Sequence, residues 1–292
     1  MRIALVTLAG VLVLGAGLVL RDKLSDGGGT RQLDDLVRTL EQRVVENPQD
    51  LNARLSIGAA YLERGLAEEA VVQFQEALKL APNDITAQIG LGRSLRASGE
   101  PQLAAEALTK VLELTKDDPL RDTSDQLQTV FYELGQIYME GDNAAGAVEQ
   151  LKEAVRINPG DADSWFALGS AYRRAGNTEA AEAAYLRSVA LVPDYVEVYS
   201  EMVGLYEDSG RTGRRLYAEG MLALASEDFP AAAETLAAAA DAEPDFAVIH
   251  EALGMVREGL GDKPGALAAY QRALELDPTL FLSGLAVERL GQ

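Results

Sequence analysis

Few residues of this chain are able to do chemistry. Among its 292 residues there is no cysteine and only one histidine, His250. Cysteine nucleophiles, disulfides, thiolate zinc sites and histidine-based clusters are therefore excluded. No Gly-Lys phosphate loop, Gly-x-Ser-x-Gly elbow or dinucleotide fingerprint occurs. We interpret His250 as a packed side chain, and the sequence predicts no catalytic residue, no metal site, no cofactor and no small-molecule substrate.

Paired carboxylates are the next candidates for chemistry, because two nearby acids can act as general acid and base. Such work needs a pocket, which the sequence does not show. The pairs lie near expected helix starts, where acidic side chains cap free N–H groups and complement the helix dipole. We therefore interpret them as caps. The pairs are Glu68-Glu69, Asp117-Asp118 and Asp161 with Asp163.

Charge narrows the class of partner. The chain has 46 Asp and Glu against 26 Lys and Arg, a net charge of −20, which argues against nucleic acid as the main partner. Arg211, Arg214 and Arg215 form the one tight basic group. We interpret it as a solvated connector, with a phosphate or lipid-headgroup contact as the alternative. An apolar fraction of 48%, rich in Ala and Leu, favours a folded helical protein.

A repeat of about 34 residues organises the chain. An apolar-Gly-x-x-(Tyr or Leu) pattern recurs at Gly58, Gly92, Gly135, Gly169, Gly220 and Gly254, with steps of 34, 43, 34, 51 and 34 residues. Each copy is followed by small and large apolar residues at i, i+4 and i+7, then usually a proline, as in Ala70, Phe74, Ala77 and Pro82. This spacing is one face of an α-helix. Each unit is therefore predicted to be a helix pair that buries its apolar face only by stacking on its neighbours.

The best-preserved unit resembles the tetratricopeptide repeat (TPR) family. The matching residues are Trp165, Leu168, Gly169, Tyr172, Ala181, Tyr185 and Pro193, with Ser188 as the departure. The resemblance covers about residues 51–280. It implies an all-α fold, a right-handed α-solenoid of antiparallel helix pairs with a concave groove.

The expected units are 51–84, 85–118, 128–161, 162–195, 213–246 and 247–280, with a half unit at 196–212. Capping helices are expected at 33–50 and 281–292. The half unit leaves one helix unpaired, and residues 209–213 contain two glycines and no apolar residue. We therefore predict two sub-solenoids, about 31–208 and 214–292, with a break between them.

The N-terminus is distinct from the repeats. Ile3 to Leu20 is an 18-residue uncharged stretch, about 27 Å long as a helix and close to the thickness of a bilayer core. We interpret residues 1–22 as a transmembrane signal anchor and 23–32 as a flexible linker. A cleaved signal peptide ending near Gly15-Ala16-Gly17 is the alternative. We expect a single-pass cell-membrane protein with the solenoid on the extracytoplasmic side.

By the resemblance, the groove is lined by three positions of each first helix: the one after the Trp165-type site, then i+4 and i+7. The candidate protein-binding residues are Ile89, Arg93, Arg96, Tyr132, Gln136, Met139, Phe166, Ser170 and Arg173. The same three positions in the units 51–84 and 213–246, which we call the groove register, are Leu55, Ala59, Leu62, Tyr217, Met221 and Leu224. Apolar, aromatic and Arg side chains suit a protein segment with apolar anchors and acidic residues. Pairing of these arginines with carboxylates of adjacent repeats is the alternative.

The function expected is that of a non-enzymatic, membrane-anchored protein–protein interaction scaffold. Residues 36–80 also resemble the TPR region of membrane-bound c-type cytochrome assembly factors. An assembly factor that holds client proteins in the cell envelope is therefore the alternative, and an accessory subunit of an envelope machine is another. Partners are expected to be protein or peptide segments, together with the membrane through the N-terminal helix.

Overall fold

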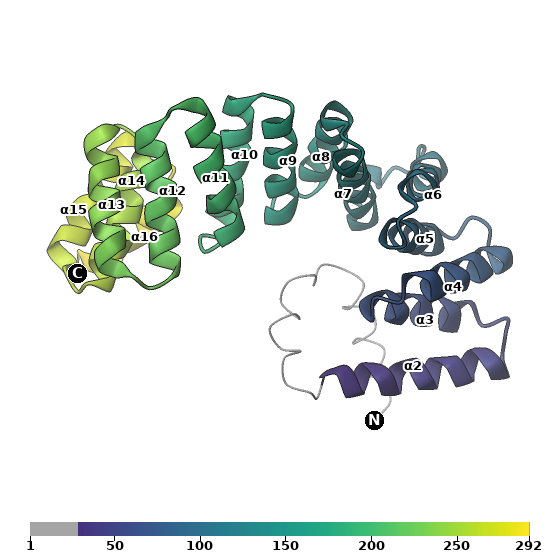
Figure 1. Cartoon of the computed structure of the whole chain (residues 1–292). Helices are drawn as coiled ribbons and strands as arrows, with labels where there is room; N and C mark the ends of the chain where they lie inside the picture. Colours follow the sequence, from purple (N-terminus) through teal and green to yellow (C-terminus); the bar gives the residue numbers. More distant parts are fainter. Residues whose placement is uncertain (1–28, 292) are drawn as a thin grey trace. The chain divides into compact units, whose positions relative to one another are not determined.

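The structure is a computed structural model that describes residues 29–291. In that range it contains fifteen α-helices and one 3₁₀ turn (Figure 1). The predicted all-α stack of helix pairs is confirmed. The chain divides into two compact units, unit 1 ending at Pro159 and unit 2 beginning at Gly160. The predicted anchor at residues 1–22 lies outside the described residues. Within residues 29–291, no helix has both the length and the apolar character needed to cross a bilayer.

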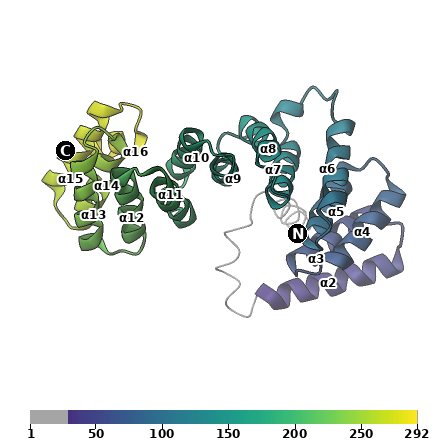
Figure 2. The ribbon, with the colours of Figure 1, turned by 45° about the horizontal axis from the view of Figure 1, so that its top comes forward.

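Unit 1 begins with a capping helix, followed by three helix pairs. Consecutive helices pack side by side, and first helices of neighbouring pairs also touch (Figure 2). Its elements are α2 (Gly29–Glu46), α3 (Leu51–Glu63), α4 (Ala67–Leu80), α5 (Ile85–Ala97), α6 (Pro101–Leu114), the 3₁₀ turn η1 (Arg121–Thr123), α7 (Asp125–Glu140) and α8 (Ala144–Ile157). Helix α2 begins within the segment expected to be linker, and the turn η1 lies in the nine-residue insertion between two repeats.

Unit 2 contains a complete pair, one additional helix, two further pairs and a closing helix. Its elements are α9 (Ala162–Arg174), α10 (Thr178–Leu191), α11 (Val196–Ser209), α12 (Thr212–Ala225), α13 (Phe229–Ala242), α14 (Ala247–Gly259), α15 (Lys263–Leu276) and α16 (Phe281–Leu290). One core of buried residues extends through this unit, from Ala181 by way of Tyr199, Tyr217 and Leu236 to Ala269.

The repeat glycines allow the two helices of each pair to approach closely. A methyl group at Gly92 of α5 would lie 2.6 Å from Leu108 Cγ and 3.3 Å from the Ala104 carbonyl oxygen, both on α6. Leu108 and Ala104 are fully buried. The same contact joins Gly58 with Phe74, Gly135 with Leu151, Gly169 with Tyr185, Gly220 with Leu236 and Gly254 with Tyr270. The glycine therefore provides the space that the large residue of the second helix occupies.

The turn inside each pair adopts one conformation in all six units. Four turns contain a glycine with positive φ, at Gly65, Gly99, Gly176 and Gly261. Asp142 and Glu227 occupy the same position in the other two units, each with φ of 59°. The left-handed conformation is thus required by the turn itself, including where the side chain disfavours it.

Helix α11 is not left without a partner, contrary to the sequence prediction. It packs against α10 on one side and α12 on the other, and α12 also packs against α13. The two compact units divide at Pro159 and not at residues 209–213. The expected break at 209–213 is therefore wrong.

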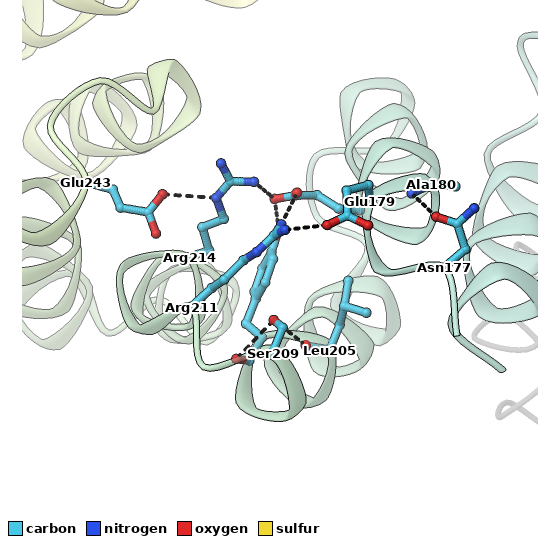
Figure 3. A network of polar contacts seen from close by, with 10 residues as sticks. Asn177, Glu179, Ala180, Leu205, Ser209, Arg211, Arg214 and Glu243 are labelled. Atoms are coloured by element: carbon cyan, nitrogen blue, oxygen red, sulfur yellow. Dashed lines mark hydrogen bonds and ion pairs between the residues drawn. The ribbon is translucent and has the colours of Figure 1, made fainter. Parts of the chain in front are cut away.

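A buried carboxylate explains this continuity. Glu182 of α10 is 6% exposed and accepts a hydrogen bond of 2.8 Å from the Tyr206 hydroxyl of α11. Arg211 donates to the same carboxylate at 2.8 Å, and Arg214 of α12 also pairs with it. Figure 3 shows these two arginines pointing toward carboxylates on either side of them. Two arginines of the group expected to be a solvated connector thus join α10, α11 and α12, while Arg215 pairs with Glu219 inside α12.

Each arginine also has a second carboxylate partner. Arg211 contacts the exposed Glu179 at 2.8 Å, and Arg214 contacts Glu243, at the end of α13, at 3.0 Å. Arg214 in addition lies 4.4 Å from the centre of the Phe246 ring. Because Glu182 is the buried member of the network, the two guanidinium groups compensate for its desolvation.

We expect Gly92→Ala to destabilise unit 1 by about 1–2 kcal/mol, because the added methyl must displace Leu108 while the gain in helix propensity offsets only part of that cost. Gly284→Ala is the matched control, since a methyl there meets nothing within 4 Å. The control should leave the urea unfolding midpoint unchanged or raise it. Equal effects of the two substitutions would contradict the packing account.

We expect Glu182→Ala to cost about 2–4 kcal/mol of unfolding free energy, because it removes the buried partner shared by two partly buried guanidinium groups and leaves the Tyr206 hydroxyl unpaired. Glu179→Ala removes an exposed partner of the same Arg211 and should cost less than about 1 kcal/mol. Urea unfolding measures both losses, and trypsin cleavage after Arg211 should accelerate only in Glu182→Ala. If the two variants unfold at the same urea concentration, the fastening role of Glu182 is wrong.

Candidate functional site

The nine predicted groove residues fall on three first helices. Helix α5 contains Ile89, Arg93 and Arg96, helix α7 contains Tyr132, Gln136 and Met139, and helix α9 contains Phe166, Ser170 and Arg173. The first six belong to unit 1 and the last three to unit 2. None of the nine is fully buried. Each of these positions therefore keeps some exposed surface, and whether they form a binding face stays a prediction.

A charged hollow of about 450 Å³ lies on this face in unit 1. It is lined by Leu62, Glu63, Arg93, Arg96, Ala97, Glu133 and Glu140, from α3, α5 and α7. Two of the predicted arginines are thus brought together with three glutamates. The glutamates were not among the residues predicted from the sequence, because they lie outside the register used for the groove.

The arginines of this hollow are paired with the next first helix. Arg96 contacts Glu133 at 2.8 Å and Glu140 at 2.8 Å, and Arg93 contacts Glu133 through Nε at 3.0 Å. Burial lowers the pKa of Arg96, but its bonds and charge interactions with Glu140 and Glu133 outweigh this and raise the pKa overall. The pairing between adjacent repeats, left open by the sequence, is therefore present in the structure.

The two arginines differ in how many donors they have left. Arg96 uses its Nε and both terminal nitrogens on carboxylates. Arg93 uses Nε, and within residues 29–291 it makes no other hydrogen bond. The Arg93 side chain is 46% exposed, compared with 27% for Arg96. Arg93 is thus the one with donors available to a partner.

Arg173 in unit 2 repeats the pattern of Arg96. It contacts Glu201 at 2.7 Å and Asp208 at 3.0 Å, both on α11. Its guanidinium lies over Gly204, where a methyl group would approach within 2.6 Å of it. The sequence pattern places Val203 where a repeat glycine is expected. The neighbouring Gly204 instead provides room for the arginine.

The apolar candidates have mainly packing roles. Ile89 and Tyr132 pack against the core of unit 1. The ring of Phe166 lies 6.1 Å from that of Tyr185 and 5.4 Å from that of Tyr195, and Ser170 accepts a hydrogen bond from the Tyr185 hydroxyl at 3.2 Å. Gln136 and Met139 are half-buried. Whether any of them contacts a partner stays a prediction.

A second, apolar hollow of about 60 Å³ lies in unit 2. Its walls come from α10, α11, α12 and α14 and from the residues around the start of α16. The lining residues are Leu186, Val189, Ala190, Pro193, Tyr199, Tyr217, Met221, Val248, Glu251, Ala252, Met255, Leu280 and Leu282. Tyr217 and Met221, which the sequence register placed in the groove, are each only 4% exposed and belong to the core of unit 2.

The sequence analysis missed Glu251 and Met255, which line this hollow. They occupy the same register in the unit 247–280: one position after His250, which stands at the Trp165-type site, and four positions further. Extending the register to this last unit would have identified both. Burial raises the pKa of the Glu251 carboxyl above its ordinary value of 4.5, although hydrogen bonds from Ser283 oppose the shift.

His250, expected to be a packed side chain, is half-buried and makes one hydrogen bond. Its Nε2 lies 2.7 Å from the Pro244 carbonyl oxygen, a hydrogen bond between α14 and the loop that follows α13. Across the described part of the chain, no group of three or more His, Cys, Asp or Glu side chains has a geometry that could hold a metal ion.

The geometry defines a class of protein: stacked helix pairs, with one polar hollow in unit 1 and one apolar hollow in unit 2. The Tetratricopeptide repeat family profile matches residues 33–85, 60–119, 132–196 and 217–280. The chain therefore belongs to the tetratricopeptide repeat family. It has the fold of a protein–protein interaction scaffold, and this fold is typically non-catalytic.

Three known proteins illustrate the likeness. Superkiller protein 3 of Schizosaccharomyces pombe is 26% identical over 178 residues, which is 61% of this chain and 13% of that protein. The structure of MamA 41-end from Desulfovibrio magneticus RS-1 is 21% identical with a TM-score of 0.52, covering 61% of this chain and 93% of that one. The Cut9-Hcn1 structure is 18% identical with a TM-score of 0.51, covering 89% and 46%. At these identities the two structures show the fold alone.

We expect Glu251→Gln to stabilise the protein near neutral pH. A carboxyl whose pKa is raised by folding is protonated more readily in the folded chain, so its ionisation costs stability as pH rises from the unfolded pKa through the folded one. The melting temperature of Glu251→Gln relative to wild type should therefore increase between about pH 5 and pH 8. Glu234→Gln, an exposed change on α13, controls for loss of negative charge. A constant difference across this range would contradict the burial of Glu251.

Proposed function

We propose that this protein is a non-enzymatic, membrane-anchored scaffold whose first helices hold segments of partner proteins. The observation that supports this most is the charged hollow of unit 1. It is large enough for several side chains, and none of its lining residues is required to complete the hydrophobic core. Such a surface suits a polypeptide segment, which brings both charged and apolar groups.

The ion pairs of the hollow decide which partner chemistry fits. Glu133 is 7% exposed and already neutralised by two arginines, so a partner has little to gain by displacing it. Arg93 still has unused N–H donors at the exposed edge. A carboxylate from the partner would bind there without breaking an existing pair. We therefore propose that an acidic residue of the partner docks on Arg93, with neighbouring apolar residues on Leu62.

The anchor belongs to the same proposal. The uncharged stretch Ile3–Leu20 has the length of a transmembrane helix, and Arg2 on one side and Arg21 and Lys23 on the other fit its ends. Helix α2 begins at the last of the three consecutive glycines, Gly27, Gly28 and Gly29. We propose that the scaffold stands close to the membrane on the extracytoplasmic side.

Leu62 and Ala97 both line the charged hollow. Photo-crosslinkers placed at either position should therefore capture one and the same partner protein in native membranes. The matched position is Lys110 on the second helix α6, which is exposed and lies outside the hollow. Arg93→Gln should reduce capture about tenfold if the guanidinium meets a carboxylate that is desolvated on binding. Arg38→Gln, an exposed change on α2, should not.

Two results would overturn the proposal. Discrete crosslinks from position 110 and none from 62 or 97 would place binding on another face. Release of the intact chain by carbonate extraction, or a mature N-terminus beyond Gly17, would remove the anchor while leaving the scaffold. Circular dichroism and melting curves must match wild type for each variant.

A further inference from the structure

The apolar hollow of unit 2 is lined by one carboxylate, that of Glu251, and only one of its two oxygens accepts hydrogen bonds within the described residues. Oε1 of Glu251 accepts two hydrogen bonds from Ser283, from its backbone N–H at 3.1 Å and from its hydroxyl at 2.9 Å. Within residues 29–291, Oε2 has no hydrogen bond and no ion pair. Every buried side-chain oxygen in that range has a partner, so this oxygen is open to the surface. It is a free acceptor fixed in position by its bonded neighbour.

The surroundings of Glu251 favour a cation. Among the described residues that line the hollow it is the only charged one, and its neighbours are aliphatic, Met, Pro and Tyr side chains. An ion pair formed beside such walls is weakly screened by water, so it gains more than one on the open surface. Residues 160–292 also contain 22 Asp and Glu against 10 Lys and Arg. Their negative field attracts basic segments.

The size and shape of the hollow select among basic groups. A cavity of about 150 Å³ holds a benzene ring, and this hollow of about 60 Å³ therefore holds one narrow aliphatic chain but no ring or helix. A lysine stem has this shape and buries its methylenes readily. An arginine pairs best with both oxygens of a carboxylate, and here one oxygen is already occupied by Ser283. A single free oxygen suits the compact ammonium of lysine.

We propose that the Glu251 hollow binds a single lysine side chain of a partner protein segment. The stem lies against Met221, Met255 and Leu282, and the ammonium donates to Oε2 of Glu251. This inference rests on the proposed function, because it assumes that the chain binds protein segments. It adds a second contact of opposite charge preference to the acid-binding Arg93 of unit 1.

Nuclear magnetic resonance of methionine methyl groups provides the test on the full chain in detergent. Met221 and Met255 line the hollow, while Met139 in unit 1 and the fully buried Met202 report nonspecific changes. The probe is a blocked alanine pentapeptide with one central lysine. Its matched counterparts replace the lysine with arginine, norleucine or Nε-acetyl-lysine. The lysine peptide should shift the Met221 and Met255 signals, and each counterpart should bind more weakly, norleucine by about tenfold.

Two variants connect the shifts to the hollow. Glu251→Gln keeps an oxygen for Ser283 but removes the charge, and it should weaken the lysine peptide about tenfold while leaving norleucine unchanged. Ala190→Leu narrows the hollow from an exposed position of α10 and should weaken every peptide. Glu234→Gln is the charge-matched control and should bind as wild type. Melting curves check that each variant is folded.

Three outcomes of these experiments would contradict the lysine site. Equal binding of the lysine and norleucine peptides, unchanged lysine binding in Glu251→Gln, or no shift of Met221 and Met255 would each overturn the inference. The proposed function would survive any of them if crosslinks from Leu62 and Ala97 still captured a partner. Conversely, if those crosslinks are absent but the lysine peptide still binds, only the proposed binding site of unit 1 is wrong.

Discussion

The close approach of two helices at one glycine is the contact on which the whole stack depends. In all six pairs the glycine of the first helix faces a large residue of the second: Phe74, Leu108, Leu151, Tyr185, Leu236 or Tyr270. The large side chain fills the space, and fully buried alanines such as Ala104 keep the backbones close. Since each pair shares its remaining apolar surface with the next, this local geometry is repeated along each unit.

This dependence explains how much of the fold was predictable. Glycine spacing, the small and large positions of the second helix and the turn residues are all local signals, and they gave the helix pairs within a few residues. Helix α11 was misjudged because its support is not local. Arg211 and Arg214 pair with Glu182, which lies about a repeat earlier in the chain and on another helix. The local sequence around residues 209–215 contains two glycines and three arginines. It does not show that the buried carboxylate of Glu182 pairs with two of these arginines.

The sequence register separated the groove positions from the core only in part. The nine candidate residues keep some exposure, but Tyr217 and Met221, which follow the same register, are buried in the core of unit 2. Whether the nine residues form a binding face stays a prediction. The register also could not reveal that Arg96 and Arg173 pair with carboxylates of the following first helix, because that pairing depends on how neighbouring repeats stack. Nor could a list of residue types distinguish Glu251 from the other 45 acidic residues. Its distinction comes from the apolar walls and from Ser283, which occupies only one of its oxygens.

Charges in this stack therefore fall into two kinds. Those that join one helix to another are neutralised within the fold and contribute to geometry, as Glu182 and Glu133 do. Charged side chains that keep an unused donor or acceptor at a hollow, such as Arg93 and Glu251, use only part of their hydrogen-bonding capacity to stabilise the fold. Burial also makes the ionisation of Glu251 costly. A partner group of opposite charge would offset that cost. The two proposals thus assign opposite preferences to the two units, acidic partner residues at Arg93 of unit 1 and basic ones at Glu251 of unit 2. A chain that has a large net negative charge and binds as proposed would discriminate between partner segments by local pairing, which its overall charge would not allow.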